Sequence, residues 1–137
     1  MIRDLLAAMV AHLRAQPGIV ALVGDRVFGV ELPAGETAHM PRSALVLTPS
    51  GGTVTEYARA LPLDSLRVDA WCYGVTPHEA QRLRRAVRAA LRSMTRVQVG
   101  AVLFHWAQPA GGYSTGRDPD TRWPRVWESY TVLASET

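Results

Sequence analysis

The sequence predicts an α+β protein, with one mixed, mostly antiparallel sheet of four to five strands and two main helices packed on one face. Residues 2–14 and 76–94 have the apolar spacing of amphipathic helices. Short β-prone stretches surround these two segments and are separated by glycine and proline. Because two helices cover only one face of such a sheet, we expect the other face to meet solvent or a partner.

The length and composition are those of a single domain over residues 1–137 with one hydrophobic core. All 15 basic residues are arginine, and the formal net charge is +3. No apolar run is long enough to cross a bilayer, and the N-terminus lacks the pattern of a signal peptide, so no membrane contact is expected. The lone cysteine excludes an internal disulfide and fits a reducing cytoplasm.

The remaining elements follow from short local patterns. A helical turn is favoured at residues 19–23, and loops are predicted at 32–41 and 107–124, where glycine and proline are frequent. Strands are predicted at 26–30, 43–48, 66–73, 97–106 and 126–133. Residues 53–63 fit either an extension of the sheet or a hairpin arm.

The segment from residue 66 to 94 reads as a strand, a tight turn at Gly74 and a long helix. Thr76 is a suitable N-cap, Pro77 suits the first helical position, and Glu79 completes a capping box. The strand alternates with period two, so its side chains divide between two faces. The predicted core face holds Leu66, Val68, Ala70 and Cys72, and the other face holds Arg67, Asp69, Trp71 and Tyr73.

Two surfaces of the predicted fold remain without a role in the core. The sheet face away from the helices is expected to carry the large rings Trp71, Tyr73, Phe104 and Trp106, which is typical of an interface. The polar side of the long helix carries Arg82, Arg84, Arg85, Arg88 and Arg92. Arg84, Arg88 and Arg92 form a stripe that fits a solvated face, a protein contact or a nucleic-acid contact.

A survey of reactive residues predicts no enzyme, no cofactor and no metal site. Cys72 falls on the core face, and the sequence lacks a Gly-x-Ser-x-Gly motif and phosphate-binding glycine loops. The four histidines are scattered without the spacing of metal ligands. Asp118 and Asp120 are better explained by turn chemistry at Asp-Pro-Asp than by calcium binding or acid–base catalysis.

The order and spacing of several segments resemble the tail terminator, or tail completion, proteins of long-tailed bacteriophages, a family first described as a domain of unknown function. The resemblance spans nearly the whole chain, and Leu22-Val23-Gly24-Asp25-Arg26-Val27 is its most specific part. The other matching segments are residues 1–6, the strand 68–71 that leads into the arginine-rich helix, and 118–121 followed by 125–126.

The resemblance implies a structural protein rather than an enzyme. It implies a ring of six subunits that caps the tail tube, stops its growth and joins the tail to the head connector or head-closure protein. The implied location is the head-proximal end of the virion tail, after assembly in the host cytoplasm, with DNA passing through the ring without specific binding. The long segment 107–124 and the additional tryptophans depart from the general pattern of the family.

The predicted interface with neighbouring subunits and partners combines the spare sheet face, the arginine stripe and the segment 107–124. Its candidate residues are Arg67, Asp69, Trp71, Tyr73, Arg84, Arg88, Arg92, Tyr113, Arg117, Asp118, Asp120, Arg122 and Trp123. Two other functions also fit the sequence. One is a different head–tail joining protein, such as a head-closure or adaptor subunit, and the other is a basic nucleic-acid-binding module.

Overall fold

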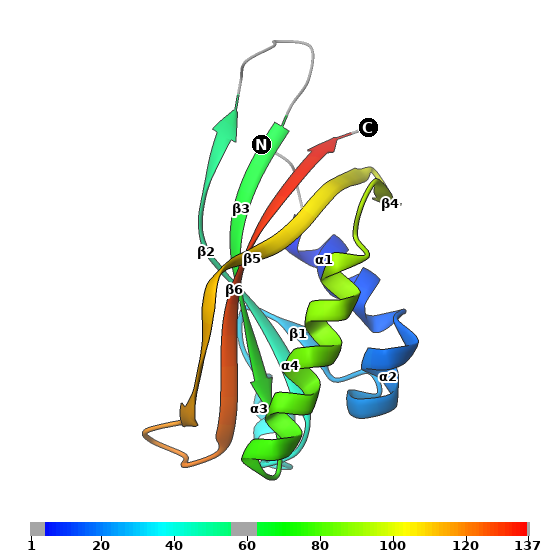
Figure 1. The fold of residues 1–137 in the computed structure, drawn as a ribbon. Helices are drawn as coiled ribbons and strands as arrows, with labels where there is room; N and C mark the ends of the chain where they lie inside the picture. The colour runs from blue at the N-terminus through cyan, green and yellow to red at the C-terminus, as the bar shows by residue number, and fades with distance from the viewer. Residues whose placement is uncertain (1–4, 56–62, 137) are drawn as a thin grey trace.

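The computed structural model of the chain describes residues 5–55 and 63–136, which form one six-stranded sheet and four helices (Figure 1). The helices are α1 (Leu5–Arg14), α2 (Pro17–Val23), α3 (Ala34–Thr37) and α4 (Pro77–Arg92). The strands are β1 (Val27–Gly29), β2 (Ala44–Thr55), β3 (Leu63–Tyr73), β4 (Val97–Val99), β5 (Val102–Arg117) and β6 (Pro124–Glu136). The α+β class is confirmed, but the sheet has six strands instead of four to five.

The sheet is mixed, with strand order β1-β2-β3-β6-β5-β4. Only β1 and β2 are parallel, and every other neighbouring pair is antiparallel. The four inner strands β2, β3, β6 and β5 are long, whereas the outermost strands β1 and β4 have three residues each. The sixth strand arises because the predicted strand 97–106 is divided between β4 and β5.

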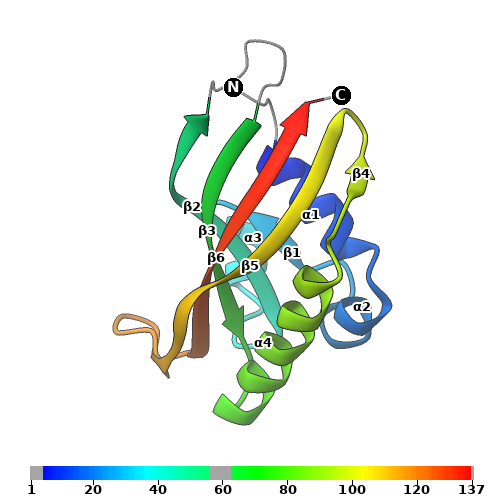
Figure 2. The ribbon, with the colours of Figure 1, turned by 45° about the horizontal axis from the view of Figure 1, so that its top comes forward.

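The core lies between the sheet and the helices α1, α2 and α4, which gather on one side (Figures 1 and 2). Leu83, Val87 and Leu91 of α4 are buried against the sheet at the spacing expected for an amphipathic helix. Val68 and Cys72 of β3 are fully buried opposite them, as the period-two pattern predicts. Cys72 is a core residue, and its burial raises the pKa of the thiol.

The start of α4 confirms the predicted capping residues. Thr76 Oγ1 accepts a hydrogen bond from the Glu79 backbone N–H at 3.2 Å. The Glu79 carboxylate accepts a hydrogen bond at 2.9 Å from the N–H of Val75, one residue before the cap, instead of from Thr76 itself. Gly74 lies directly against the first turn of the helix and allows the strand and helix to meet without a linker.

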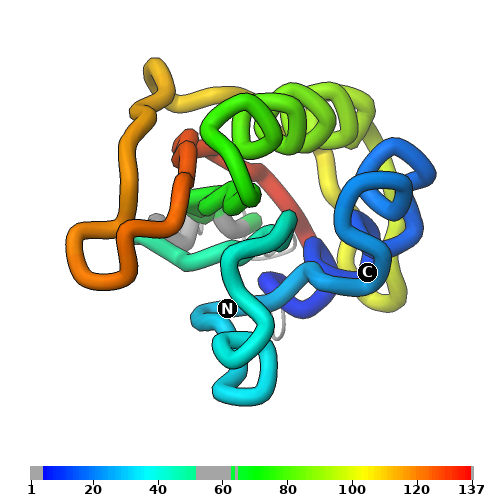
Figure 3. The backbone as a smooth tube through the Cα atoms, turned by 90° about the horizontal axis from the view of Figure 1, so that it is seen from below, coloured from blue at the N-terminus to red at the C-terminus, as the bar shows by residue number. Residues whose placement is uncertain are grey.

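The prediction of a loop at residues 107–124 is confirmed only for residues 118–123 and is wrong for the rest of the segment. β5 continues to Arg117 and forms a long hairpin with β6, so only residues 118–123 connect the two strands. The glycines and Pro109 are accommodated because β5 departs from regular pairing between Pro109 and Tyr113. We call residues 108–126 the arm; Figure 3 shows its tip on the side of the molecule away from α1 and α2.

The predicted faces of residues 97–106 are also wrong in part. The segment is two strands, β4 and β5, because the chain reverses at Gly100, which has a φ of +60°. Phe104 therefore lies fully buried in the core and is not part of the spare face. A register shift between Phe104 and Trp106 places Trp106 opposite Leu133, on the face away from the helices.

The other local predictions have mixed outcomes. The helical turn at 19–23 is confirmed as part of α2, and the predicted loop 32–41 contains the short helix α3. The open segment 53–63 extends the sheet through Thr55 and again from Leu63, and residues 56–62 lie outside the described part of the chain.

In the described ranges, no single helix is both long and apolar enough to cross a membrane. Together, α1 and α2 reach the required length and composition, but they are bent by 81° at their junction. Several of their apolar side chains, including Met9, Leu13 and Ile19, are buried in the core.

We predict that Gly74→Ala destabilises the chain by about 1–3 kcal/mol, because the added methyl group overpacks a tight contact. A Cβ at this position would lie 2.6 Å from the Ala80 backbone nitrogen and 2.9 Å from Glu79 Cβ. Denaturant unfolding followed by circular dichroism measures the change. Gly116→Ala is the matched control, since its Cβ meets no atom within 4 Å. Equal unfolding midpoints for the two variants would contradict the packing described.

Candidate assembly surfaces

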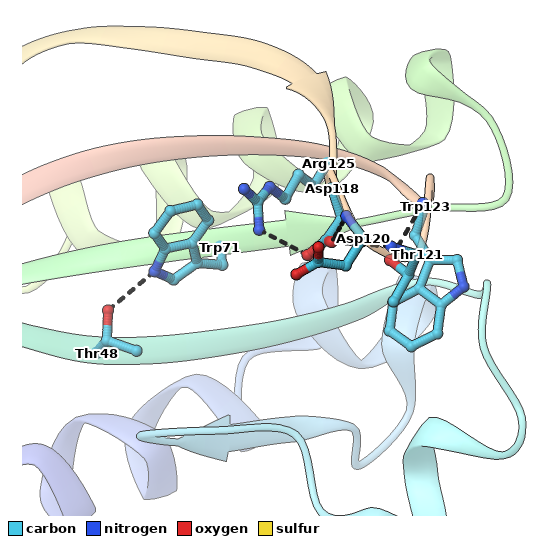
Figure 4. A network of polar contacts seen from close by, with 7 residues as sticks. All are labelled: Thr48, Trp71, Asp118, Asp120, Thr121, Trp123 and Arg125. Carbon is cyan, nitrogen blue, oxygen red and sulfur yellow. Dashed lines mark hydrogen bonds and ion pairs between the residues drawn. The ribbon is translucent and has the colours of Figure 1, made fainter.

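The sheet face away from the helices, here called the outer face, is organised around Trp71 (Figure 4). Its indole N–H donates a hydrogen bond to Thr48 Oγ1 of β2 at 2.9 Å. Its ring lies 5.8 Å from that of Trp127 on β6, and the guanidinium carbon of Arg125 lies 4.6 Å from the ring centre. Trp71 therefore connects three neighbouring strands and is held in one orientation.

The tip of the arm is closed by Asp118. One carboxylate oxygen accepts hydrogen bonds from the backbone N–H groups of Asp120 and Thr121, at 2.9 and 3.0 Å. The other oxygen accepts one from Arg125 Nη1 at 3.0 Å. The backbone hydrogen bond from Thr121 contributes most to lowering the pKa of Asp118, and the charge of Arg125 adds to the effect. These contacts support the turn interpretation of Asp118 and Asp120.

Further rings continue the outer face toward the tip. Trp123 packs edge-on against Tyr73, with ring centres 6.2 Å apart and planes at 78°. Arg117 donates a hydrogen bond to the Arg122 carbonyl at 3.0 Å, so these two arginines help to shape the turn. The structure thus brings the predicted residues of β3 and of segment 117–123 together at one end of the outer face.

The predicted residues Arg67 and Asp69 lie farther along the same face of β3. Asp69 accepts hydrogen bonds from the hydroxyl groups of Ser50 and Ser129 on the two flanking strands. Arg67 is exposed. Along β3 itself, the outer face therefore changes from rings near the arm to polar and charged groups, while Trp106 of β5 lies on the same face level with Ser65.

The arginine stripe of α4 is not a uniform exposed surface. Arg84 is 7% exposed and points toward Glu128 of β6, with a shortest nitrogen–oxygen distance of 3.9 Å. Its guanidinium carbon lies 3.9 Å from the ring centre of Tyr113. Arg88 approaches the same carboxylate at 3.8 Å and is partly exposed. The prediction that Arg84 lies on the polar side of the helix is wrong, because a buried carboxylate draws it inward.

Glu128 is an acidic residue on the sheet face that the helices cover, and it is 1% exposed. It accepts a hydrogen bond from the Tyr130 hydroxyl at 2.6 Å, and burial together with this carboxylate raises the pKa of Tyr130. One carboxylate thus faces two guanidinium groups between α4 and β6. With Tyr113 stacked on Arg84, this buried cluster fixes the arm against the helix.

The exposed charge that remains on α4 comes from Arg82, Arg85 and Arg92. Arg92 keeps its predicted place on the polar side, while Arg84 does not. A phosphate backbone would meet a shorter stripe than the sequence indicates, so the geometry favours nucleic-acid binding less than the spacing alone did. Within the described residues, no group of three or more histidine, cysteine, aspartate or glutamate side chains could hold a metal ion.

Sequence reasoning missed four residues that organise these surfaces, namely Thr48, Arg125, Trp127 and Glu128. Glu128 carried a usable signal, since it is the one charged residue between residues 126 and 133 of a β-prone apolar strand. Such an acid predicts a buried partner, and the neighbouring helix supplied an excess of arginine. The contacts of Trp127 and Arg125 depend on the register of β3 with β6, for which the sequence holds no comparable signal.

Comparison with solved structures places the fold among known proteins. The chain is similar to one chain of a solved structure described as "Virion of native gene transfer agent (GTA) particle", with a TM-score of 0.68 and 16% sequence identity. The similarity covers 96% of this chain and 94% of the other. No curated protein matches the sequence.

The family model described as "Tail completion protein gp17" matches residues 7–133. This match covers most of the chain and places it in the class of tail completion proteins, which are structural components of phage-type virions. The chain belongs to the family of tail completion protein gp17.

We predict that the stability advantage of the native chain over Asp118→Asn depends on pH. Because the folded-state pKa of Asp118 is lowered, its carboxylate stabilises the fold above the ordinary aspartate pKa, and this contribution is lost as pH falls through the lowered pKa. At neutral pH we expect a difference of about 1 kcal/mol. Unfolding curves between neutral and strongly acidic pH measure it, with Asp120→Asn as control. A difference that persists unchanged in acid would contradict this role.

We predict that Glu128→Ala destabilises the chain by about 3 kcal/mol, because it leaves the buried Arg84 without its counter-charge. Arg85→Ala, at an exposed position on the same helix, is expected to change stability by less than about 0.5 kcal/mol. A double-mutant cycle with Arg84→Ala measures the coupling between the two side chains. Strictly additive effects would show that the pair does not interact.

Proposed function

We propose that this protein caps the end of the phage tail tube as a ring of six subunits, stops tube growth and joins the tail to the head connector. In this proposal the whole chain acts as one domain at the head-proximal end of the virion tail, after assembly in the host cytoplasm. Its partners are further copies of itself, the tail tube protein and the connector or head-closure protein. DNA passes through the ring without specific contacts.

The observation that carries the proposal is the family match over residues 7–133. The geometry adds support, because a ring requires two different surfaces of one subunit to meet. The chain offers the outer face with its ordered rings, the exposed arginines of α4 and the arm, all built on a sheet whose other face is covered. These surfaces suit contacts between proteins better than a reaction, so we propose a structural role without catalysis.

A head-closure or adaptor subunit is the second candidate, since it would use the same kinds of surface. The two roles differ in the partner bound first: a tail cap binds the tube protein, and a head-closure protein binds the connector. The order of binding therefore separates them.

We predict that the purified protein stops polymerisation of the tail tube protein from the same phage. Because a cap acts only at tube ends, it should act at far below one copy per tube subunit. Tube lengths measured by negative-stain electron microscopy, with and without the protein, test this. An unrelated protein of similar charge is the control.

Two outcomes would contradict this role. Unchanged tube lengths together with binding to the connector would favour the head-closure role. Unchanged lengths with no binding to either partner would contradict both structural roles.

A further inference from the structure

Two long strands of the sheet have an edge that is only partly covered. β4 pairs with β5 only at residues 102–104, and β1 pairs with β2 only at residues 45–47. In the part of the chain that the structure describes, the outer edges of 106–117 and of 48–55 therefore pair with no strand. The outward backbone N–H and C=O groups of such edges are able to bond a strand from another chain.

The last part of β5 is a regular and unprotected edge. Up to Tyr113 the strand carries Pro109 and two register shifts, which are features that block edge-to-edge pairing. Residues 113–117 pair without interruption with residues 124–128 of β6 and are exposed at every position. Arg117, at the end, is the only charged side chain among these five residues.

The strand directions allow the sheet to continue into a second copy. The strands β2, β3, β6 and β5 alternate in direction because every pair among them is antiparallel. In a head-to-tail arrangement of identical subunits, the neighbour's β2 runs antiparallel to β5 and continues the alternation. The two open edges lie on opposite sides of the sheet, as a heterologous contact requires.

The positions of the two open edges also fit a closed ring. The regular part of the β2 edge is residues 51–55, because Pro49 and a register shift interrupt the strand before Gly51. Through the register of the sheet, residues 51–55 of β2 lie level with residues 131–135 of β6, whereas 113–117 of β5 lie level with 124–128. The centres of these regular edges are therefore offset by about 23 Å along the strands, against a width of about 19 Å for four strands. A closed ring joined in this way therefore needs strands inclined to its axis, as the strands of closed barrels are.

We propose that the edge of β5 at residues 113–117 pairs with the edge of β2, within residues 51–55, of a second copy of this chain. This contact rests on the ring of the proposed function and specifies how its subunits join. The short strands β1 and β4 block the remaining part of each edge, so they set the offset between neighbours.

Amide hydrogen exchange tests the contact on the full-length protein, alone and after assembly on tail tubes. We expect the outward amides of both edges, in 113–117 and within 51–55, to exchange at least about tenfold more slowly in the assembled protein than in the free chain. If a ring forms while the amides of both edges exchange at unchanged rates, the edge contact is wrong but the proposed function stands. If no ring forms, the proposed function fails and the edge contact fails with it.

Proline substitutions provide a second test. Successive residues of a strand direct their N–H groups to opposite edges, so one of Ser114→Pro and Thr115→Pro removes an outward N–H and the other removes one bonded to β6. We expect one of the two variants to keep its unfolding midpoint and lose at least about tenfold in ring formation by native mass spectrometry. The controls Ser114→Ala and Thr115→Ala keep the N–H and should assemble normally. The contact would be overturned if both proline variants fold stably and assemble normally.

Discussion

The packing of α4 against β3 and β6 is the interaction on which the other surfaces depend. Leu83, Val87 and Leu91 bury one side of the helix, and each such side chain contributes about 1.5–3 kcal/mol of hydrophobic stabilisation. The tight turn at Gly74 places the first turn of the helix directly against the end of β3. Once α4 is seated, one face of the sheet is covered and the outer face is left for other contacts.

The same packing also determines the position of the arm. Arg84 reaches from the covered side of α4 to Glu128 and stacks on Tyr113, so β5 and β6 are both tied to the helix. At the tip, Asp118 joins the turn to Arg125, which in turn lies over Trp71. These contacts hold the arm in a defined place before any partner binds, which lowers the ordering cost of assembly.

The sequence was sufficient for the elements that depend on local chemistry. The α+β class, the helix beginning at Thr76, the burial of Cys72 and the turn at Asp118 all follow from periodicity, capping and turn preferences. The arm was missed because its glycines and Pro109 favour a loop, whereas pairing with β6 and the irregularities of β5 accommodate them as strand. Long-range pairing overrode local preference there.

The candidate surfaces were predictable in kind but not in detail. The outer position of Trp71 and Tyr73 follows from alternation along β3, yet their partners Trp127 and Trp123 come from segments whose register the sequence leaves open. Phe104 was assigned to the wrong face because the chain reversal at Gly100 was not recognised. Arg84 was placed outside because a helix pattern alone does not reveal a buried acid on the opposing strand.

The proposed function requires that copies of this chain close into a ring on the end of the tail tube. Cryo-electron microscopy of tail tubes incubated with the purified protein tests it most directly. We expect a single ring of six subunits at one end of each tube, with neighbouring sheets joined edge to edge. Tubes with bare ends, or with the protein bound along their sides, would contradict it.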